Sequence, residues 1–183
     1  VNIMNYASLK ANVGPMAAVA GAFADILADA ITKQYSPEFL ALENGGDCAV
    51  RTTGECAICI SAGKSDFSSQ IAVKLPPGSW GIATSSGTIG HSCNFGKADA
   101  CTIIAGIQET KEPQWYTPGA YADAWATRCS NKICTPNDLE HAAALVHNDS
   151  HIYAFFACIQ DTMYYKGEFE IFPIKRSAYE TTA

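Results

Sequence analysis

The sequence contains no cluster of basic residues. Its 12 lysines and arginines are scattered along 183 residues and are outnumbered by 18 aspartates and glutamates, so the formal net charge is −6. Proteins that bind nucleic acid or anionic membranes collect positive charge on one face or segment. Neither of these partners is expected here, and a small-molecule ligand or a protein partner is favoured instead.

Long hydrophobic runs are also absent. The most apolar stretch, residues 16–31, carries Asp25 and Asp29, whereas a membrane-spanning helix needs about 18 or more consecutive apolar residues. No basic signal-peptide segment opens the sequence, which begins at Val1. We therefore expect a soluble protein with no membrane span. Because 48% of the residues are hydrophobic, we also expect one domain with a sizeable core over residues 1–183.

The eight cysteines do not reach the density of a disulfide scaffold. The cytoplasm is slightly favoured, although this number of cysteines is also compatible with an extracytoplasmic protein. Cys56 and Cys59 have no second Cys-x-x-Cys pair and no histidine nearby, so a zinc site is not expected. A hairpin turn at 53–54 would set Cys48 opposite Cys59 and permit a disulfide. Buried free thiols are the preferred interpretation.

Residues 14–35 are predicted to form a long amphipathic helix, a type that normally turns its apolar face toward the core. Small residues crowd its first half, so another element, most simply a sheet, is expected to approach the backbone closely. The apolar positions are Met16, Val19, Phe23, Ile26, Leu27 and Ile31, and the charged side carries Asp25, Asp29 and Lys33.

Strand-like segments separated by Gly, Pro, Ser and Asp indicate an antiparallel sheet with hairpins. Because helices do not alternate with single strands, the fold class is predicted to be α+β. The expected strands are 39–42, 48–53, 56–61, 71–75, 80–84 and 101–105, followed by helices at 120–130 and 138–147 and a terminal hairpin of 152–159 with 168–174.

Two common catalytic signatures, the phosphate-binding P-loop and the Gly-x-Ser-x-Gly elbow of hydrolases, are missing. Residues 84–91 instead read Thr-Ser-Ser-Gly-Thr-Ile-Gly-His after an apolar run, as expected for a strand that opens into a binding loop. His91 could act as an acid, a base or a hydrogen-bond donor. A serine hydrolase using Ser85 or Ser86 with His91 is one alternative, although such close neighbours would need a tight turn to meet.

Two further segments carry groups suited to a ligand. Residues 43–47, Glu-Asn-Gly-Gly-Asp, read either as a glycine turn between strands or as a loop that grips hydroxyls and amides. Asp123 and Thr127 are four residues apart on a predicted helix, so their oxygens share one face and could contribute to a Mg²⁺ site. An aspartate near a helix start is equally explained by capping. Lys97 is the cation near these loops that could meet a phosphate.

Taken together, five segments resemble the ApbE family of flavin transferases, and more closely an uncharacterised ApbE-related family. These segments are residues 13–21, 43–47, 84–92, 95–100 and 122–127. The resemblance implies a T-fold-like α+β architecture with a long helix and shorter helices. It also implies FAD or FMN as ligand, Mg²⁺ as cofactor, and transfer of FMN to Thr or Ser of an acceptor protein.

The resemblance also assigns roles to residues. Asp123 and Thr127 would be the Mg²⁺ ligands, and His91 and Asp47 would orient or deprotonate the acceptor. The nucleotide pocket would be lined by Gly45, Gly46, Asp47, Ser85, Ser86, Gly87 and His91. The loop residues themselves add Thr84 and the cation Lys97 to the expected cofactor-binding set.

The sequence departs from the family pattern at two places. After His91 it reads Ser-Cys-Asn-Phe-Gly-Lys where the transferases carry Asp-Pro-x-x-Gly, and it lacks the strands that precede the long helix in family members. Sharing a scaffold does not imply sharing a reaction. A non-catalytic scaffold or assembly subunit is therefore a second interpretation, with a homo-oligomer or a partner chain as its context.

Overall fold

The computed structural model describes residues 1–63, 65, 67–68, 71–89, 94–107 and 112–167, together with the backbone of a short strand at 171–173. The helices are α1 (Asn2–Ala11), α2 (Val19–Tyr35), α3 (Pro118–Ser130) and α4 (Asp138–Ala144), and a 3-10 turn, η1 (Pro15–Ala18), precedes α2. The strands are β1 (Phe39–Asn44), β2 (Asp47–Thr52), β3 (Cys56–Cys59), β4 (Ile71–Leu75), β5 (Gly78–Ser85), β6 (Ala100–Gly106), β7 (Ile152–Ile159), β8 (Thr162–Gly167) and β9 (Ile171–Pro173).

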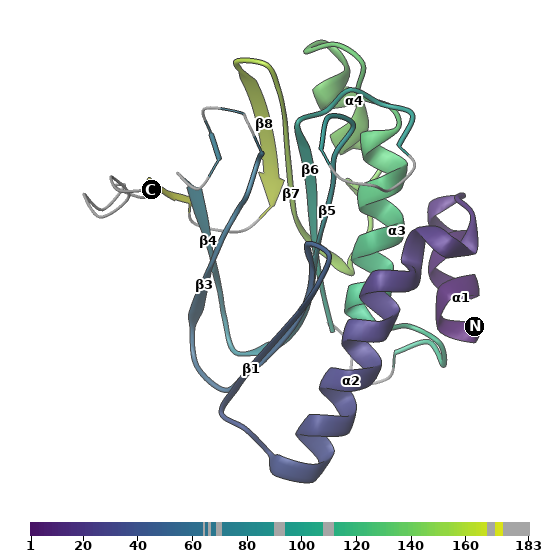
Figure 1. Cartoon of the computed structure of the whole chain (residues 1–183), viewed down its shortest axis with the longest axis vertical. Helices are drawn as coiled ribbons and strands as arrows, with labels where there is room; N and C mark the ends of the chain where they lie inside the picture. Colours follow the sequence, from purple (N-terminus) through teal and green to yellow (C-terminus); the bar gives the residue numbers. More distant parts are fainter. Residues whose placement is uncertain are drawn as a thin grey trace.

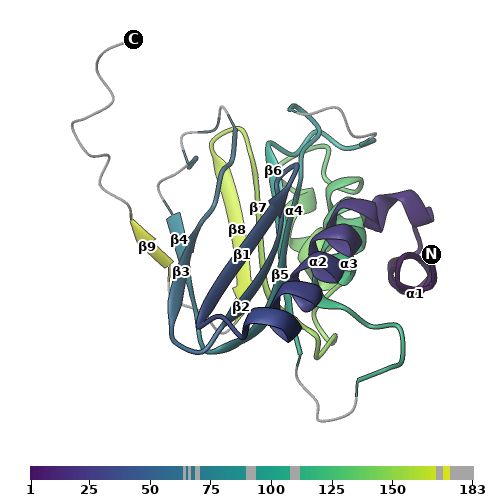
Figure 2. The same ribbon diagram turned by 60° about the horizontal axis from the view of Figure 1, so that its bottom comes forward.

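These elements form three layers. Six strands make one antiparallel sheet in the order β1-β2-β5-β6-β7-β8, and β3, β4 and β9 make a smaller sheet. The helices cover one face of the larger sheet and the smaller sheet covers the other (Figures 1 and 2). The predicted α+β class with antiparallel sheets is therefore confirmed.

Two cores lie on opposite faces of the central strands, because successive side chains of a strand point to opposite faces. Ile103 and Phe155 pack against the helices, whereas their neighbours Ile104 and Phe156 fill the space between the two sheets. The strands β6 and β7 are thus buried on both faces, which explains their nearly continuous apolar sequences.

The predicted long helix is present, but its orientation reverses the expectation. Its large apolar side chains Phe23, Ile26 and Leu27 are exposed, whereas Asp25 is completely buried. The cause is the close approach of α3: a Cβ atom added to Gly21 would lie 2.2 Å from the carbonyl oxygen of Gly119. Only small side chains fit at this contact, so the small-residue face is the buried one. The element that approaches the backbone of α2 most closely is therefore the start of α3, and the sheet packs against the same face.

Asp25 is buried because it satisfies the helix start that it contacts. Its Oδ2 accepts hydrogen bonds from the backbone N–H groups of Gly119 (2.7 Å) and Ala120 (3.1 Å), which have no partner within α3. Its Oδ1 forms an ion pair with Arg51 of β2 at 3.1 Å, and Arg51 also reaches Asp29 at 3.0 Å. This network fixes α2 and α3 on the sheet and thereby positions the pocket described below.

Two predicted hairpins are wrong. The 53–54 connection leads from the larger sheet to the smaller one, so Cys48 lies opposite Glu43 and Ile82, while Cys59 lies opposite Ala72. Both thiols are free, as expected, but they are not buried: Cys48 is half-buried and Cys59 is exposed.

The second wrong hairpin is the terminal one. Strand β7 pairs with β8, which the sequence analysis did not predict, and β9 crosses to the smaller sheet and pairs with β4. Helix α1 was not predicted either.

One helical stretch among the described residues, Pro15–Tyr35, is long and apolar enough to cross a bilayer by length and composition alone. About a third of it is buried in the protein. Its buried side carries the Asp25–Arg51 ion pair, as expected of a helix packed into a globular fold.

Candidate functional site

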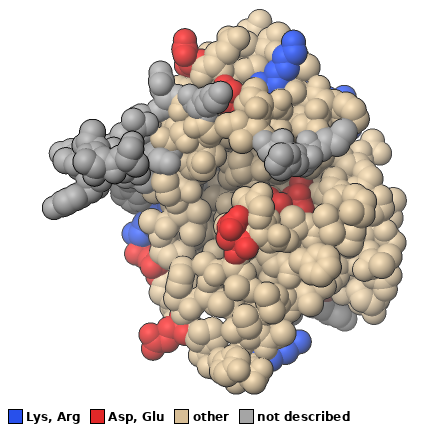
Figure 3. All heavy atoms as spheres, viewed as in Figure 1, with Lys and Arg blue, Asp and Glu red and all other residues tan. Residues whose placement is uncertain are grey.

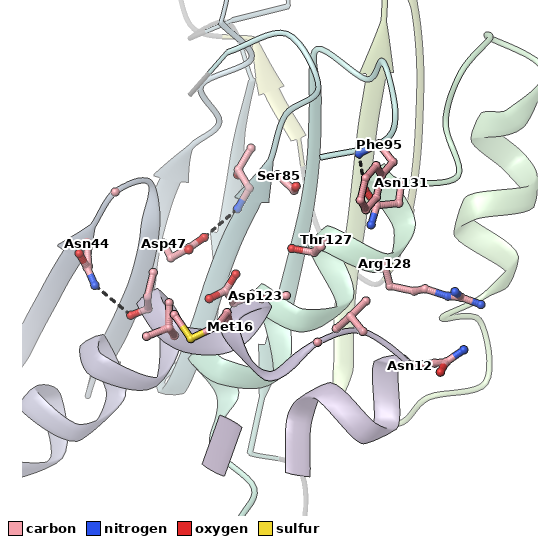
Figure 4. A pocket seen from close by; sticks show the side chains of 17 residues that line it. Asn12, Met16, Asn44, Asp47, Ser85, Phe95, Asp123, Thr127, Arg128 and Asn131 are labelled. Carbon is pink, nitrogen blue, oxygen red and sulfur yellow. Dashed lines mark hydrogen bonds between the residues drawn. The ribbon is translucent and has the colours of Figure 1, made fainter. Parts of the chain in front are cut away.

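A pocket of about 600 Å³ opens where the start of β2 and the end of β5 meet the start of α2 and the second half of α3 (Figure 4). Segments far apart in the sequence converge here, as the sequence analysis expected for 43–47, 84–85 and 123–127. The lining residues are Asn12, Val13, Gly14, Met16, Ala17, Val19, Ala20, Asn44, Gly45, Asp47, Thr84, Ser85, Phe95, Asp123, Thr127, Arg128 and Asn131.

Two carboxyl groups, Asp47 from β2 and Asp123 from α3, point toward the same part of this pocket, with the Thr127 hydroxyl beside them (Figure 4). Burial and the neighbouring Asp123 carboxylate raise the pKa of Asp47 from 3.8 to about 8, against one backbone hydrogen bond from Thr84. Burial raises the pKa of Asp123 to about 6, opposed by the N–H groups of Gly21 and Ala20. The fold thus places two carboxyl groups close together in a buried site, where their ionised forms are disfavoured.

Backbone donors hold both carboxyl groups in place. Asp47 Oδ1 accepts a hydrogen bond from the N–H of Thr84 at 3.2 Å, which ties β2 to β5 at the pocket. Asp123 Oδ2 accepts one from the N–H of Gly21 at 3.0 Å and so caps the start of α2 from a neighbouring helix. The capping role anticipated for Asp123 is therefore real, but it serves α2 rather than its own helix.

The donor set fits a hard divalent cation. Asp47, Asp123 and Thr127 supply oxygen ligands on one side, and Mg²⁺ typically takes one or two carboxylates and completes its octahedron with water and phosphate oxygens. Within the described part of the chain, no ion pair joins either carboxylate to a basic side chain. No cluster of three or more His, Cys, Asp or Glu side chains suited to a metal occurs there either, so the protein would provide only part of the coordination shell.

The glycine segment is a tight turn and also a wall of the pocket. Asn44 and Asp47 pair across the β1–β2 hairpin, and the two central glycines have φ angles of 68° and 102°, which non-glycine residues rarely adopt. Glu43 Oε1 accepts the N–H of Gly46 at 2.6 Å, and the Asn44 amide donates to the carbonyl of Ala20 at 3.2 Å. The glycine-turn interpretation is therefore confirmed, and the ligand-gripping interpretation stays a prediction that the position of the turn at the pocket permits.

A second cavity of about 680 Å³ lies between the two sheets and shares Gly45 and Thr84 with the first. Gly46 and Ser86 line this second cavity, whereas Ser85 lines the first. The predicted nucleotide-binding residues are thus divided between two neighbouring spaces.

For the serine–histidine alternative, the described residues include the two serines but not the histidine. The Ser85 hydroxyl accepts a hydrogen bond from the Asn94 amide at 2.7 Å, and the same amide donates to Ser130 at 2.7 Å. None of the described histidines lines the first pocket. His91 lies outside the described residues.

Two predicted contributors do not line either cavity. Lys97 is exposed, and Gly87 packs against the carbonyl oxygen of Gly96, where an added Cβ would lie 2.2 Å away. The cation that does line the first pocket is Arg128, whose side chain extends away from the two carboxylates (Figure 4). The sequence feature that could have identified Arg128 as a lining residue is its position directly after Thr127.

The end of α1, which lines the pocket at Asn12, was missed by the sequence analysis. Asn12 ends α1 with a left-handed φ of 55°, and the chain then turns past Val13 and Gly14 to the start of α2. Residues 13–21 had drawn notice through the resemblance, but α1 has only a weak apolar periodicity.

The sequence matches the family described as AbpE bacteria over residues 1–157. The chain belongs to this family. Proteins named UPF0280 protein are similar as well: the one from Methanospirillum hungatei is 38% identical over 156 residues, covering 84% of this chain and 57% of its own length. The relative from Methanosphaerula palustris is 42% identical over 125 residues, covering 67% of this chain and 48% of its own length.

A third relative, from Methanocaldococcus jannaschii, is 37% identical over 135 residues, covering 72% of this chain and 49% of its own length. The chain thus spans about half the length of the curated relatives it matches. The names of these relatives specify no activity, so membership of the family leaves the chemistry of the pocket to be argued from its geometry.

Proposed function

We propose that the pocket binds a phosphate-bearing small molecule, of which a flavin nucleotide is the leading candidate, together with Mg²⁺. The observation that carries this proposal is the pair of buried carboxyl groups Asp47 and Asp123, which face one pocket without a basic partner among the described residues. Such a pair is stable either with a proton or with a cation, because like charges in a low-dielectric site repel. A divalent cation would satisfy both carboxylates at once.

The flavin nucleotide is suggested by the ApbE resemblance, and the convergence of its segments supports the suggestion. Gly45, Asp47, Thr84, Asp123 and Thr127 are spread over more than eighty residues of sequence yet line the same pocket. The T-fold-like architecture belongs to the same proposal, supported by the antiparallel sheets with helices on one face. The neighbouring apolar cavity offers room for more of a large ligand.

The reaction proposed for this site is transfer of FMN from FAD to a protein hydroxyl. The acceptor oxygen forms a bond to the FMN phosphorus, the bond to the AMP phosphate breaks, and AMP leaves. Asp47 would hold the cation through one carboxylate oxygen and take the proton of the acceptor hydroxyl on the other, and the backbone N–H of Thr84 would hold the carboxyl in place. Bound Mg²⁺ would polarise the pyrophosphate oxygens and stabilise the charge that develops on them.

The test is incubation of the purified protein with FAD and Mg²⁺. Flavin fluorescence would report saturable binding, and chromatography would report AMP and FMN. Asp123→Asn keeps an oxygen that can accept the Gly21 N–H but removes the charge, so we expect at least a tenfold loss of Mg²⁺-dependent binding. Asp161→Asn, which removes an exposed carboxylate in the β7–β8 turn, should change nothing. Absence of flavin binding at millimolar concentration would overturn the proposal.

A non-catalytic scaffold is the second candidate function, and one observation favours it. The outer face of α2 exposes a row of large apolar side chains, as expected of a protein that works through contact with another chain. In this case Asp47 and Asp123 would have only structural roles, and neither flavin binding nor AMP release would be detected.

A further inference from the structure

The outer face of α2 exposes several large apolar side chains. Phe23, Ile26 and Leu27 are 63%, 55% and 52% exposed, and they follow the i, i+3, i+4 spacing of a single helical stripe. Met16, in η1 just before α2, extends the stripe at its start and is 71% exposed. Figure 3 shows largely uncharged surface over α2 in the lower part of the molecule.

The exposed stripe lies on the face of α2 that does not pack against the rest of the described chain. Small residues and Asp25 occupy the buried face of α2, so the large apolar side chains have no role in the core of this chain. Monomeric proteins rarely expose contiguous apolar surface of more than a few hundred square ångströms. The arrangement is therefore that of a helix with one face for its own fold and a second face for a partner.

We propose that the partner is a second copy of this chain, packed through an antiparallel α2–α2 contact about a two-fold axis. The four large, more than half-exposed side chains of the stripe offer on the order of 500 Å² of surface per copy. Burial on both copies would remove about 1,000 Å², the area that a biological interface is expected to reach. A self-complementary apolar patch suits two-fold symmetry, because each copy presents the same surface.

Charge placement favours this occupant over a membrane. The only basic residue on α2 is Lys33, and a membrane-surface helix usually carries several on its polar face. With the two-fold axis near Ile26, the centre of the stripe, Lys33 of one copy lies beside Val19 of the other, since both are two helical turns from the axis. Val19 lines the acidic pocket, so each copy would place a cation near the other's pocket mouth.

Dimerisation through α2 would also affect the pocket. Met16 belongs both to the helical stripe and to the lining of the pocket, and the half-buried Val19 lines the pocket one turn further along the chain. Dimerisation would therefore narrow the pocket entrance at the start of α2. The two sites of the dimer would share one interface rather than face solvent separately.

The test is the molecular mass in solution, measured by light scattering during size-exclusion chromatography, for the wild type, Phe23→Glu and Leu9→Glu. Leu9 is 80% exposed on α1 and is the matched control, because the same apolar-to-acidic change is made away from the stripe. We expect a wild-type dimer, a Leu9→Glu dimer and a Phe23→Glu monomer at micromolar concentration. A wild-type monomer, or a dimer that withstands Phe23→Glu, overturns the proposal.

A second measurement keeps the proposal testable if Phe23→Glu does not fold. Ile26→Cys places a thiol next to the proposed two-fold axis, so mild oxidation should link the two substituted positions across the dimer. Peptide mapping separates this linkage from any through the native exposed thiols of Cys59 and Cys134. Linkage of Leu9→Cys with equal efficiency, or binding of the wild type to anionic vesicles instead of dimerisation, would contradict the proposal.

Discussion

Asp47 lies where burial and a neighbouring carboxylate both favour its protonated form, and its pKa of about 8 is above the ordinary value of 3.8. Between these two pH values the folded protein binds more protons than the unfolded chain does. The free energy of unfolding therefore falls as the pH rises through this window. The structure tolerates this cost at a pocket, which is typical of carboxyl groups with a role in binding or catalysis.

Asp47→Asn removes the titrating group while an amide oxygen can still accept the Thr84 N–H. Without added metal we expect this variant to be more stable than the wild type by about 2 kcal/mol at pH 8 and to lose most of the decline between pH 5 and 8. Thermal unfolding at several pH values, in the presence of a chelator, measures both effects. An equally steep decline in Asp47→Asn would contradict the assigned pKa.

Arg51 is the residue on which the buried ion-pair network depends. Removing its charge in Arg51→Met leaves Asp25 buried without its cation, and we expect a loss of about 3–5 kcal/mol in the free energy of unfolding. Asp29→Asn breaks only the contact with the half-exposed partner and should cost less than about 1 kcal/mol. Denaturant titration measures the free energy of unfolding of both variants. Equal losses of stability would show that the buried Arg51–Asp25 contact contributes no more than the half-exposed one.

At the scale of elements, the contact of α2 with the start of α3 organises the helical layer. Gly21 and Gly119 allow the two backbones to touch, Asp25 caps α3, and Asp123 caps α2. Each helix thus supplies the acid that satisfies the other's first N–H groups. This reciprocal capping brings Asp123 next to Asp47 and so creates the acidic pocket.

Gly21→Ala tests this contact directly. The new Cβ would lie 2.2 Å from the Gly119 oxygen, which is backbone and cannot rotate away, so the helices must separate. We expect a loss of about 2–4 kcal/mol in the free energy of unfolding and weaker ligand binding at the pocket. Gly14→Ala is the control, because no atom lies within 4 Å of its added Cβ and the change should be nearly neutral. Equal stability of both variants would rule out the close packing.

At the scale of the whole molecule, the three-layer arrangement explains what sequence patterns could and could not predict. Composition and turn residues were enough for the α+β class and for most strand positions, because alternation and turn chemistry are local. The partner of each strand is not local: β2 and β3 are neighbours in sequence, yet they belong to different sheets. The Cys48–Cys59 register failed for this reason.

The orientation of α2 shows a second limit. Apolar periodicity locates an amphipathic face but does not say whether that face is buried in the core or exposed, as it is in α2. The crowd of small residues did signal a close neighbour, and Gly21 proved to be at that contact. The candidate site was found at Asp47, Thr84, Asp123 and Thr127 because these residues carry chemistry and lie in recognisable segments. Asn12 was missed because only the folded chain brings it to the pocket, whereas Arg128 directly follows Thr127 in the sequence.

The central claim is that Asp47 and Asp123 together form a divalent-cation site, and Mg²⁺ titration by isothermal calorimetry tests it most directly. We predict saturable binding of one Mg²⁺ per chain at pH 8, strengthened by a nucleotide diphosphate. Binding should be at least tenfold weaker at pH 5.5, where protons compete for both carboxylates, and should be lost in Asp47→Asn and Asp123→Asn. Binding that is absent at pH 8, or that persists unchanged in both variants, would contradict the account.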